Sequence, residues 1–247
     1  PPPRTRGLAK AIRGTATQAA DAASLPFLPE LDVLARRKPR IDGGLPRTGN
    51  PIEDIVEALT NTKNSYVAVQ GPPGTGKTYT GARVIKRLVQ EHGWKVGVVA
   101  QSHATVENML RGIINAGLPA HLVAKKPKTP SGKKAESNDE SSKVPWTNVE
   151  AGKISGFLDE HDEGCVLGGT MWDFVNDERV DRRSLDLLVI DEAGQFSLAG
   201  TLAAAVSAKR LLLLGDPQQL PQVSQGTHPE PVDQSAVEWV MNGSPTI

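Results

Sequence analysis

Apolar residues recur along this chain in two patterns, which predict alternating helices and strands. Helical spacing predicts amphipathic helices that begin near Asn50, Lys77 and His103, and a further one from about Ser235 to Met241. Nearly continuous apolar runs predict strands at residues 66–69, 95–100, 164–170, 185–190 and 210–214. Such strands, separated by helices, are typical of a parallel sheet that is covered on both faces. The sequence therefore predicts an α/β fold with helices on both faces of a parallel sheet.

Two segments depart from this pattern. Residues 1–48 are rich in Pro, Arg, Gly and Ala and show no sustained period. We expect either a basic arm near nucleic acid or a solvated linker there. Residues 124–150 are dominated by Lys, Ser, Pro, Asn and Glu, a composition that buries too little apolar area to offset chain entropy. We expect a mobile insertion at about 124–150, within one domain that spans residues 49–247.

Composition narrows the class of protein. Lys+Arg and Asp+Glu both total 28, so the net charge is zero, which argues against a protein that coats nucleic acid by charge alone. Cys165 is the single cysteine, so no disulfide framework exists and a cytoplasmic setting is expected. No apolar run approaches the ~20 residues of a membrane span, and no membrane partner is expected. The chain begins at Pro1 without a methionine, and we expect a piece of a longer protein.

A glycine-rich segment follows the first predicted strand and precedes a predicted helix. It has the full P-loop pattern and continues into Tyr79, with the residues Gly71, Pro72, Pro73, Gly74, Thr75, Gly76, Lys77 and Thr78. The glycines let backbone N–H groups wrap closely around phosphates. Lys77 can reach the β- and γ-phosphates, and the Thr78 hydroxyl can bind Mg²⁺. The pattern predicts a site for ATP or another nucleoside triphosphate with Mg²⁺; the alternative is a fortuitous glycine-rich turn.

Polar residues follow two later strands at what should be the same edge of the sheet. Asp191 and Glu192 come directly after the apolar run that ends at Ile190. In this fold Asp191 suits a metal role, and Glu192 can orient and deprotonate an attacking water. Gln219, in the loop after the next strand, can contact the γ-phosphate or that water. A solvated acidic turn and an idle amide are the alternatives for these residues.

Taken together, these motifs resemble a known family. GPPGTGKT, DEAGQ and GDPQQLPQV are similar to motifs I, II and III of superfamily 1 helicases, closest to the branch of the nonsense-mediated-decay and replication nuclease-helicases. The resemblance covers roughly residues 65–243, with 101–103 in the place of motif Ia and 169–170 in that of motif Ic. Residues 185–223 also resemble bacterial proteins in which such a motor follows a RecB-like nuclease domain. The resemblance implies a P-loop NTPase with a RecA-like sheet.

The resemblance also implies roles for individual residues. It makes residues 74–78 phosphate ligands, Asp191 a metal-site residue and Glu192 the catalytic base. Gln195 and Gln219 would couple nucleotide state to movement. The side chains expected to face single-stranded nucleic acid, with DNA the favoured polymer, are Ser102, His103 and Thr170. Trp172 is either a stacking platform for bases or a core tryptophan.

Two departures from the family pattern shape the expectation. The branch carries a glutamine upstream of the P-loop for adenine recognition, whereas residues 49–69 contain none. The second RecA-like lobe, with its arginine fingers, does not follow residue 247 in this sequence. Such a finger contributes on the order of 10³ to 10⁵ in rate in related systems. We expect this first lobe alone to bind nucleotide, to hydrolyse it slowly and not to unwind.

Three functions are compatible with the motifs. The first is a nucleic-acid-dependent NTPase motor that acts as a helicase or translocase. The second is a nucleotide-gated binding or regulatory module in which turnover is incidental. The third is an AAA-type ring ATPase, against which the pair DEAGQ and GDPQQLPQV argues.

Overall fold

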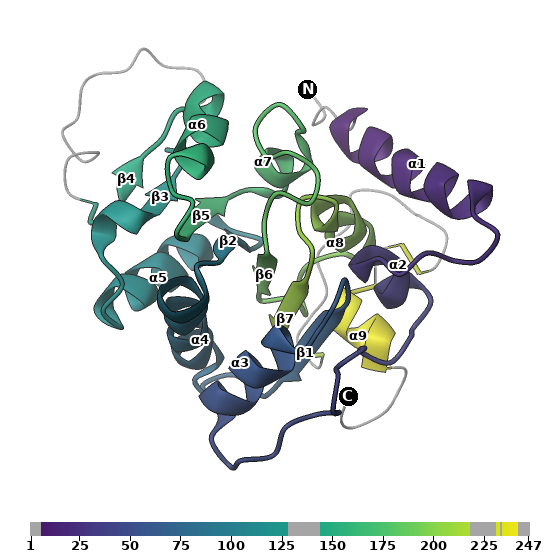
Figure 1. Ribbon diagram of the computed structural model, residues 1–247, viewed down its shortest axis with the longest axis horizontal. Helices are drawn as coiled ribbons and strands as arrows, with labels where there is room; N and C mark the ends of the chain where they lie inside the picture. The colour runs from purple at the N-terminus through teal and green to yellow at the C-terminus, as the bar shows by residue number, and fades with distance from the viewer. Residues whose placement is uncertain (1–5, 128–143, 218–230, 233, 242–247) are drawn as a thin grey trace.

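A seven-stranded parallel sheet forms the centre of the computed structural model, which describes residues 6–127, 144–217, 231–232 and 234–241 (Figure 1). The strands lie in the order β1-β7-β6-β2-β5-β3-β4, and every pairing between them is parallel. Their bounds are β1 Tyr66–Gln70, β2 Lys95–Val99, β3 Val123–Lys125, β4 Thr147–Asn148, β5 Cys165–Gly169, β6 Leu187–Asp191 and β7 Leu211–Gly215. The parallel sheet expected from the five apolar runs is confirmed.

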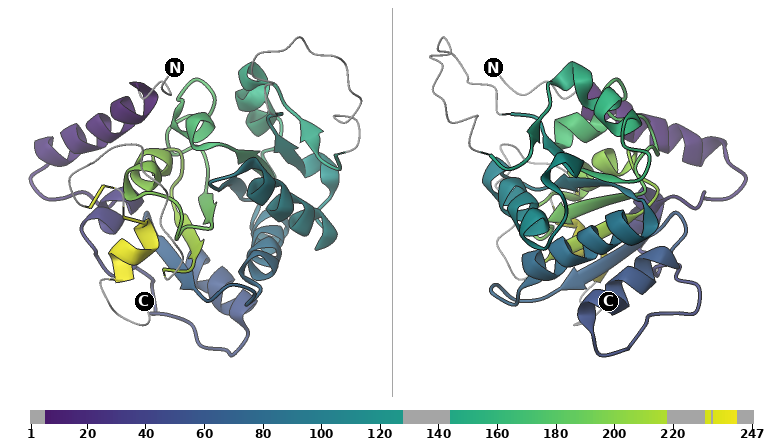
Figure 2. Two further views of the ribbon diagram at one scale, coloured as in Figure 1. Left: turned by 180° about the vertical axis from the view of Figure 1, so that it is seen from behind. Right: turned by 60° about the vertical axis from the view of Figure 1, so that its left-hand side comes forward.

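Helices cover both faces of the sheet, as Figures 1 and 2 show. One apolar cluster joins α3, α4 and α5 to one face, and a second joins α2, α6, α7, α8 and α9 to the other. None of the helices within the described residues is long and apolar enough to span a membrane. The helical bounds are α1 Arg6–Asp21, α2 Pro29–Leu34, α3 Pro51–Thr60, α4 Lys77–His92, α5 His103–Asn115, η1 Ala120–Leu122, η3 Ala151–Lys153, α6 Ile154–Asp159, α7 Met171–Val175, α8 Leu198–Ala205 and α9 Ala236–Met241.

The predicted helix ends match the observed caps closely. The Asn50 side chain accepts a hydrogen bond of 3.1 Å from the Ile52 N–H, and Pro51 is the first residue of α3. Helix α4 starts at Lys77 and ends at His92, where Gly93 adopts a left-handed conformation with φ of 66°. Local capping chemistry therefore fixes where α3 and α4 begin or end.

The amino-terminal residues differ from the expected linker or arm. Helix α1 occupies Arg6–Asp21, and Ala11 is buried in a small cluster that packs against α8. Leu8 and Ile12 complete the apolar side of α1 in contact with this cluster, which includes Val206. The structure therefore has two helices, α1 and α2, within the segment that was expected to form a linker or a basic arm. Leu8 and Ile12 are the only large apolar residues of α1, so its apolar side is hard to recognise in sequence.

The expected insertion at 124–150 also begins and ends in regular structure. Residues 128–143 lie outside the described residues, but β3 and β4 flank them and extend the sheet beyond β5. Lys125 in β3 is only 3% exposed, and its ammonium lies 3.0 Å from the Glu107 carboxylate on α5. This partly buried ion pair and the pairing of β3 with β5 hold a segment whose polar composition suggested a loop.

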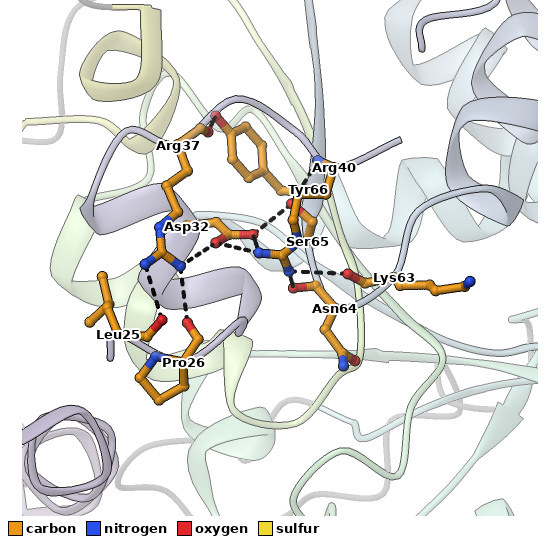
Figure 3. Close-up of polar contacts among 9 residues, drawn as sticks. All are labelled: Leu25, Pro26, Asp32, Arg37, Arg40, Lys63, Asn64, Ser65 and Tyr66. Carbon is orange, nitrogen blue, oxygen red and sulfur yellow. Dashed lines mark hydrogen bonds and ion pairs between the residues drawn. The ribbon is translucent and has the colours of Figure 1, made fainter. Parts of the chain in front are cut away.

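A buried carboxylate ties the amino-terminal segment to β1 (Figure 3). Asp32 is fully buried, and its carboxylate lies 3.3 Å from Arg37 and 2.9 Å from Arg40. Ser65 donates a hydrogen bond of 2.7 Å to Asp32, and the Tyr66 hydroxyl donates one of 2.8 Å to the Arg37 carbonyl. We call this cluster the Asp32 clasp. It joins the segment after α2 to the amino-terminal end of β1.

Removal of the Asp32 carboxylate should destabilise the fold strongly. Asp32→Ala leaves two guanidinium groups without their shared partner, and breaking a buried ion pair costs about 3–5 kcal/mol. We expect the free energy of unfolding in urea to fall by about that amount. The matched control is Asp42→Ala, because Asp42 pairs with Lys63 at 3.2 Å with both side chains largely exposed. Equal midpoints for the two variants would contradict a structural role for the clasp.

Candidate nucleotide site and adjoining cavity

The predicted P-loop joins the carboxyl end of β1 to the start of α4. The Gly71 N–H donates to the Gly215 carbonyl at 3.2 Å, which fixes the loop beside the end of β7. Gly74 and Gly76 both have φ of 79°, a left-handed conformation that residues with a Cβ rarely adopt. The loop therefore needs glycine at these two positions. Tyr79, on the first turn of α4, is 59% exposed and lies under the Arg83 guanidinium.

The Lys77 ammonium lies within the P-loop. It donates to the carbonyl oxygens of Gly71 and Pro72, at 2.9 Å in the case of Pro72. The Thr75 hydroxyl also donates to the Pro72 carbonyl, at 2.8 Å. The cation is thus held by neutral dipoles at the centre of the loop. A polyphosphate bound there would supply charged oxygens, which make stronger hydrogen bonds with an ammonium than carbonyls do.

Asp191 and Thr78 meet at the edge of the sheet. The Thr78 hydroxyl donates to the Asp191 carboxylate at 3.3 Å, although the two residues come from α4 and β6. Asp191 is only 2% exposed. Its burial raises its pKa to about 6, while the Glu192 N–H, Thr78 and Lys77 act in the opposite direction. Two adjacent oxygen ligands of this kind fit Mg²⁺, which usually takes one or two protein oxygens together with phosphate oxygens and water.

Residues 191–194, which we call the DEAG turn, are in very close backbone contact with the residues at the end of β7 and directly after it. The Ala193 N–H donates to the Leu214 carbonyl at 2.8 Å. A Cβ added to Gly194 would lie 2.1 Å from the Asp216 carbonyl oxygen, so this position admits glycine alone. Glu192 itself has a left-handed φ of 55°. The turn therefore carries backbone strain at the acidic pair, Asp191 and Glu192, which no motif in the sequence indicated.

A cavity of about 490 Å³ lies beyond the carboxyl ends of β2 and β5. The three residues expected to face nucleic acid all line it, and Trp172 lines it as well and is half-buried. The structure thus brings together positions that are far apart in sequence. The lining also includes Met171, Phe196 and Ser197, which the motifs did not indicate. Each of these residues follows a recognised motif in the sequence without belonging to it, so the motifs did not indicate them.

Two of the lining residues also cap helices. The Ser102 side chain accepts a hydrogen bond of 3.1 Å from the Thr105 N–H at the start of α5. The Thr170 hydroxyl donates to the Asp173 carboxylate at 2.7 Å at the start of α7. Asp173 is buried and holds ion pairs with Lys126 and Arg179, both at 2.7 Å. The cavity wall is therefore fixed by capping and by a buried carboxylate.

The sequence did not indicate the partner of Glu192. The Thr105 hydroxyl donates to the Glu192 carboxylate at 3.0 Å, and it also lies 2.9 Å from the Ser102 hydroxyl. Two glutamines were expected to couple nucleotide state to movement. One of them, Gln195, lies in a turn in which its N–H donates to the Glu192 carbonyl at 2.8 Å. Gln219 lies outside the described residues.

Comparison with known proteins agrees with this geometry. A family model described as an AAA domain matches residues 53–238, which is well over half of the chain. The chain belongs to the AAA domain family. The matched residues of this AAA domain lie within the expected lobe at 49–247, whose exact limits stay a prediction.

Individual relatives of this AAA domain are helicases. It is 25% identical over 166 residues to the DNA replication ATP-dependent helicase/nuclease JHS1 of Arabidopsis thaliana, covering 67% of this chain and 12% of that protein. It is 29% identical over 165 residues to the replication helicase/nuclease of Saccharomyces cerevisiae, covering 63% and 10% respectively. It is 28% identical over 184 residues to the regulator of nonsense transcripts 1 homolog of Drosophila melanogaster, covering 62% and 15%.

These relatives confirm the expected resemblance to the superfamily 1 motor lobe. They include replication helicase/nucleases and a regulator of nonsense transcripts. The chain spans 10% to 15% of the length of these three relatives.

Asp191 should make the stability of the ligand-free AAA domain depend on pH. Its pKa is about 6 in the folded chain against 3.8 for an ordinary aspartate. Between these values the folded chain keeps a proton that the unfolded chain has lost, so stability falls as the pH rises from 4 to 6. Asp191→Asn removes this effect while it keeps an acceptor for the Glu192 N–H.

We therefore expect Asp191→Asn to gain about 2–3 kcal/mol of unfolding free energy relative to the wild type between pH 4 and pH 7. Urea unfolding without nucleotide or magnesium at several pH values measures this difference. A difference between the two proteins that stays constant over that range would show that Asp191 does not titrate as described.

Proposed function

We propose that this AAA domain is the first motor lobe of a nucleic-acid-dependent NTPase, with ATP as the expected triphosphate, that acts as a helicase or translocase. The observation that carries the proposal is the hydrogen bond between Thr78 and Asp191. It joins the P-loop to the acidic pair across the carboxyl edge of the sheet. The cavity lined by Ser102, His103 and Thr170 adjoins the same edge.

Within this proposal, the P-loop holds the triphosphate. Its inward N–H groups and the amino end of α4 bind phosphate oxygens, and Tyr79 closes the set of nucleotide contacts. Lys77 leaves its carbonyl partners for the β- and γ-phosphates. Thr78 and Asp191 hold Mg²⁺, which when bound offsets the negative charge that the phosphates develop during transfer.

Glu192 orients the attacking water and accepts its proton. Gln195 and Gln219 sense whether the γ-phosphate is present, and they pass that state to the rest of the motor. A second RecA-like lobe supplies arginine fingers and closes on the triphosphate, and an upstream nuclease domain fits the relatives named helicase/nuclease.

Single-stranded nucleic acid, with DNA the expected polymer, occupies the cavity beyond β2 and β5. Its backbone would contact Ser102, His103 and Thr170, and a base would stack on Trp172. Contacts to the phosphate backbone are independent of base sequence and weaken as salt rises. The helicase names of two of the relatives support this motor function over the ring-ATPase alternative.

Lys77 provides the first test. Lys77→Ala removes the only P-loop ammonium, and we expect the affinity for a fluorescent ATP analogue with magnesium to fall at least about tenfold, since charge-assisted hydrogen bonds to phosphate are lost. Lys86→Ala, on the same helix, is the matched control and should bind the analogue as the wild type does. Unchanged affinity in Lys77→Ala would remove the basis of the nucleotide site.

Glu192 provides the second test. In the full-length protein, single-stranded DNA should stimulate ATP hydrolysis, and Glu192→Gln should lower kcat by about 10² or more while nucleotide affinity is retained. Glu53→Gln, on the exposed side of α3, serves as the control. Absence of stimulation by either DNA or RNA would refute the motor. If Glu192→Gln abolishes hydrolysis yet leaves the biological activity intact, the protein is instead a nucleotide-gated binding module.

A further inference from the structure

The two neighbouring carboxylates of the site are bound to different parts of the fold. Asp191 accepts a hydrogen bond from Thr78 on the P-loop side. Glu192 accepts one of 3.0 Å from Thr105 on α5, on the side of the cavity. The two side chains thus have partners on different helices, α4 for Asp191 and α5 for Glu192. The group with the expected role of water activation is thus attached to a helix outside the P-loop.

The number of protons on each group determines which atom donates in the hydrogen bonds of Thr105. An ionised carboxylate only accepts hydrogen bonds, so the Thr105 hydroxyl proton points to Glu192. The Thr105 hydroxyl has no second proton, and the bond of 2.9 Å to Ser102 must therefore be donated by the Ser102 hydroxyl. The Ser102 oxygen in turn accepts the Thr105 N–H at 3.1 Å. A directed chain of hydroxyl groups runs from Ser102 through Thr105 to Glu192.

The two ends of this chain lie in different sites. Ser102 lines the cavity, whereas Glu192 belongs to the acidic pair at the nucleotide site. A phosphate group in the cavity is a strong acceptor for the Ser102 hydroxyl proton. If Ser102 turns its proton to a phosphate, Thr105 loses the donor that polarises its own hydroxyl. Because neighbouring hydrogen bonds strengthen one another, the bond from Thr105 to Glu192 is then weakened.

We propose that Thr105 is a positioning residue that tethers Glu192 to α5, and that a polynucleotide phosphate at Ser102 loosens this tether. The inference rests on the proposed function and deepens it, because it names the link between the two sites. Loosening frees the Glu192 carboxylate to turn towards the attacking water, so polymer binding raises kcat. The tether limits hydrolysis when the cavity is empty.

The decisive variant is Thr105→Val, which keeps the branched shape but removes the hydroxyl. In the full-length protein without polymer, we expect kcat for ATP to rise about three- to tenfold, the usual effect of one hydrogen bond, with KM unchanged. The ratio of kcat with and without single-stranded oligo(dT) should fall towards one. Thr105→Ser keeps the hydroxyl and should restore both the low basal kcat and the stimulation.

A binding measurement provides a second readout that does not depend on turnover. Coupling between two sites is reciprocal, so a non-hydrolysable ATP analogue should alter the affinity for fluorescent oligo(dT) in the wild type. Thr105→Val should reduce this change at least threefold, whereas Thr105→Ser should retain it. A merely structural role of Thr105 would lower thermal stability without altering the coupling.

The outcomes separate the tether from the motor function. A basal kcat in Thr105→Val that equals or falls below that of the wild type overturns the tether, as does a failure of the serine variant to restore it. Wild-type hydrolysis that neither oligo(dT) nor an RNA oligomer stimulates instead refutes the polynucleotide-dependent motor, and the tether is still judged by the basal kcat of the two variants.

Discussion

The parallel pairing of β1, β7 and β6 is the constraint on which the site depends. Parallel strands end at one edge, so the P-loop, the DEAG turn and the loop after β7 are brought together. Two backbone hydrogen bonds, Gly71 to Gly215 and Ala193 to Leu214, then fix the spacing of these three segments. The contact between Thr78 and Asp191 follows from that spacing. A change in strand order would separate these groups while every motif remained intact.

Burial determines which charge state Asp191 favours at this edge of the sheet. Asp191 loses almost all contact with solvent, and desolvation disfavours its charged form in the free protein. In the proposed function, a bound Mg²⁺ ion would place positive charge beside this carboxylate and favour its ionised form. Desolvation of this carboxylate opposes folding of the free protein above its pKa, which is the usual relation between stability and function at a ligand site.

Much of this arrangement could be predicted from the sequence, because the central strands are continuous apolar runs and the P-loop glycines are unmistakable. The same physical logic explains what was missed. Helix α1 has only Leu8 and Ile12 as large apolar residues, β3 is a short strand that pairs with β5, and β4 is a short edge strand that pairs with β3. The partnership of Thr105 with Glu192 joins residues 87 positions apart, and the position of Thr105 within α5 suggests nothing beyond helix capping.

The Asp32 clasp has a mechanical consequence. It is hydrogen-bonded to the amino end of β1, and the P-loop begins where the same strand ends. Five residues of extended chain, roughly 17 Å, separate the two. Extended backbone that is hydrogen-bonded along its length and packed on both faces stretches very little. Strand β1 therefore resists stretching. A displacement of the segment after α2 would be transmitted along β1 to the P-loop almost undiminished.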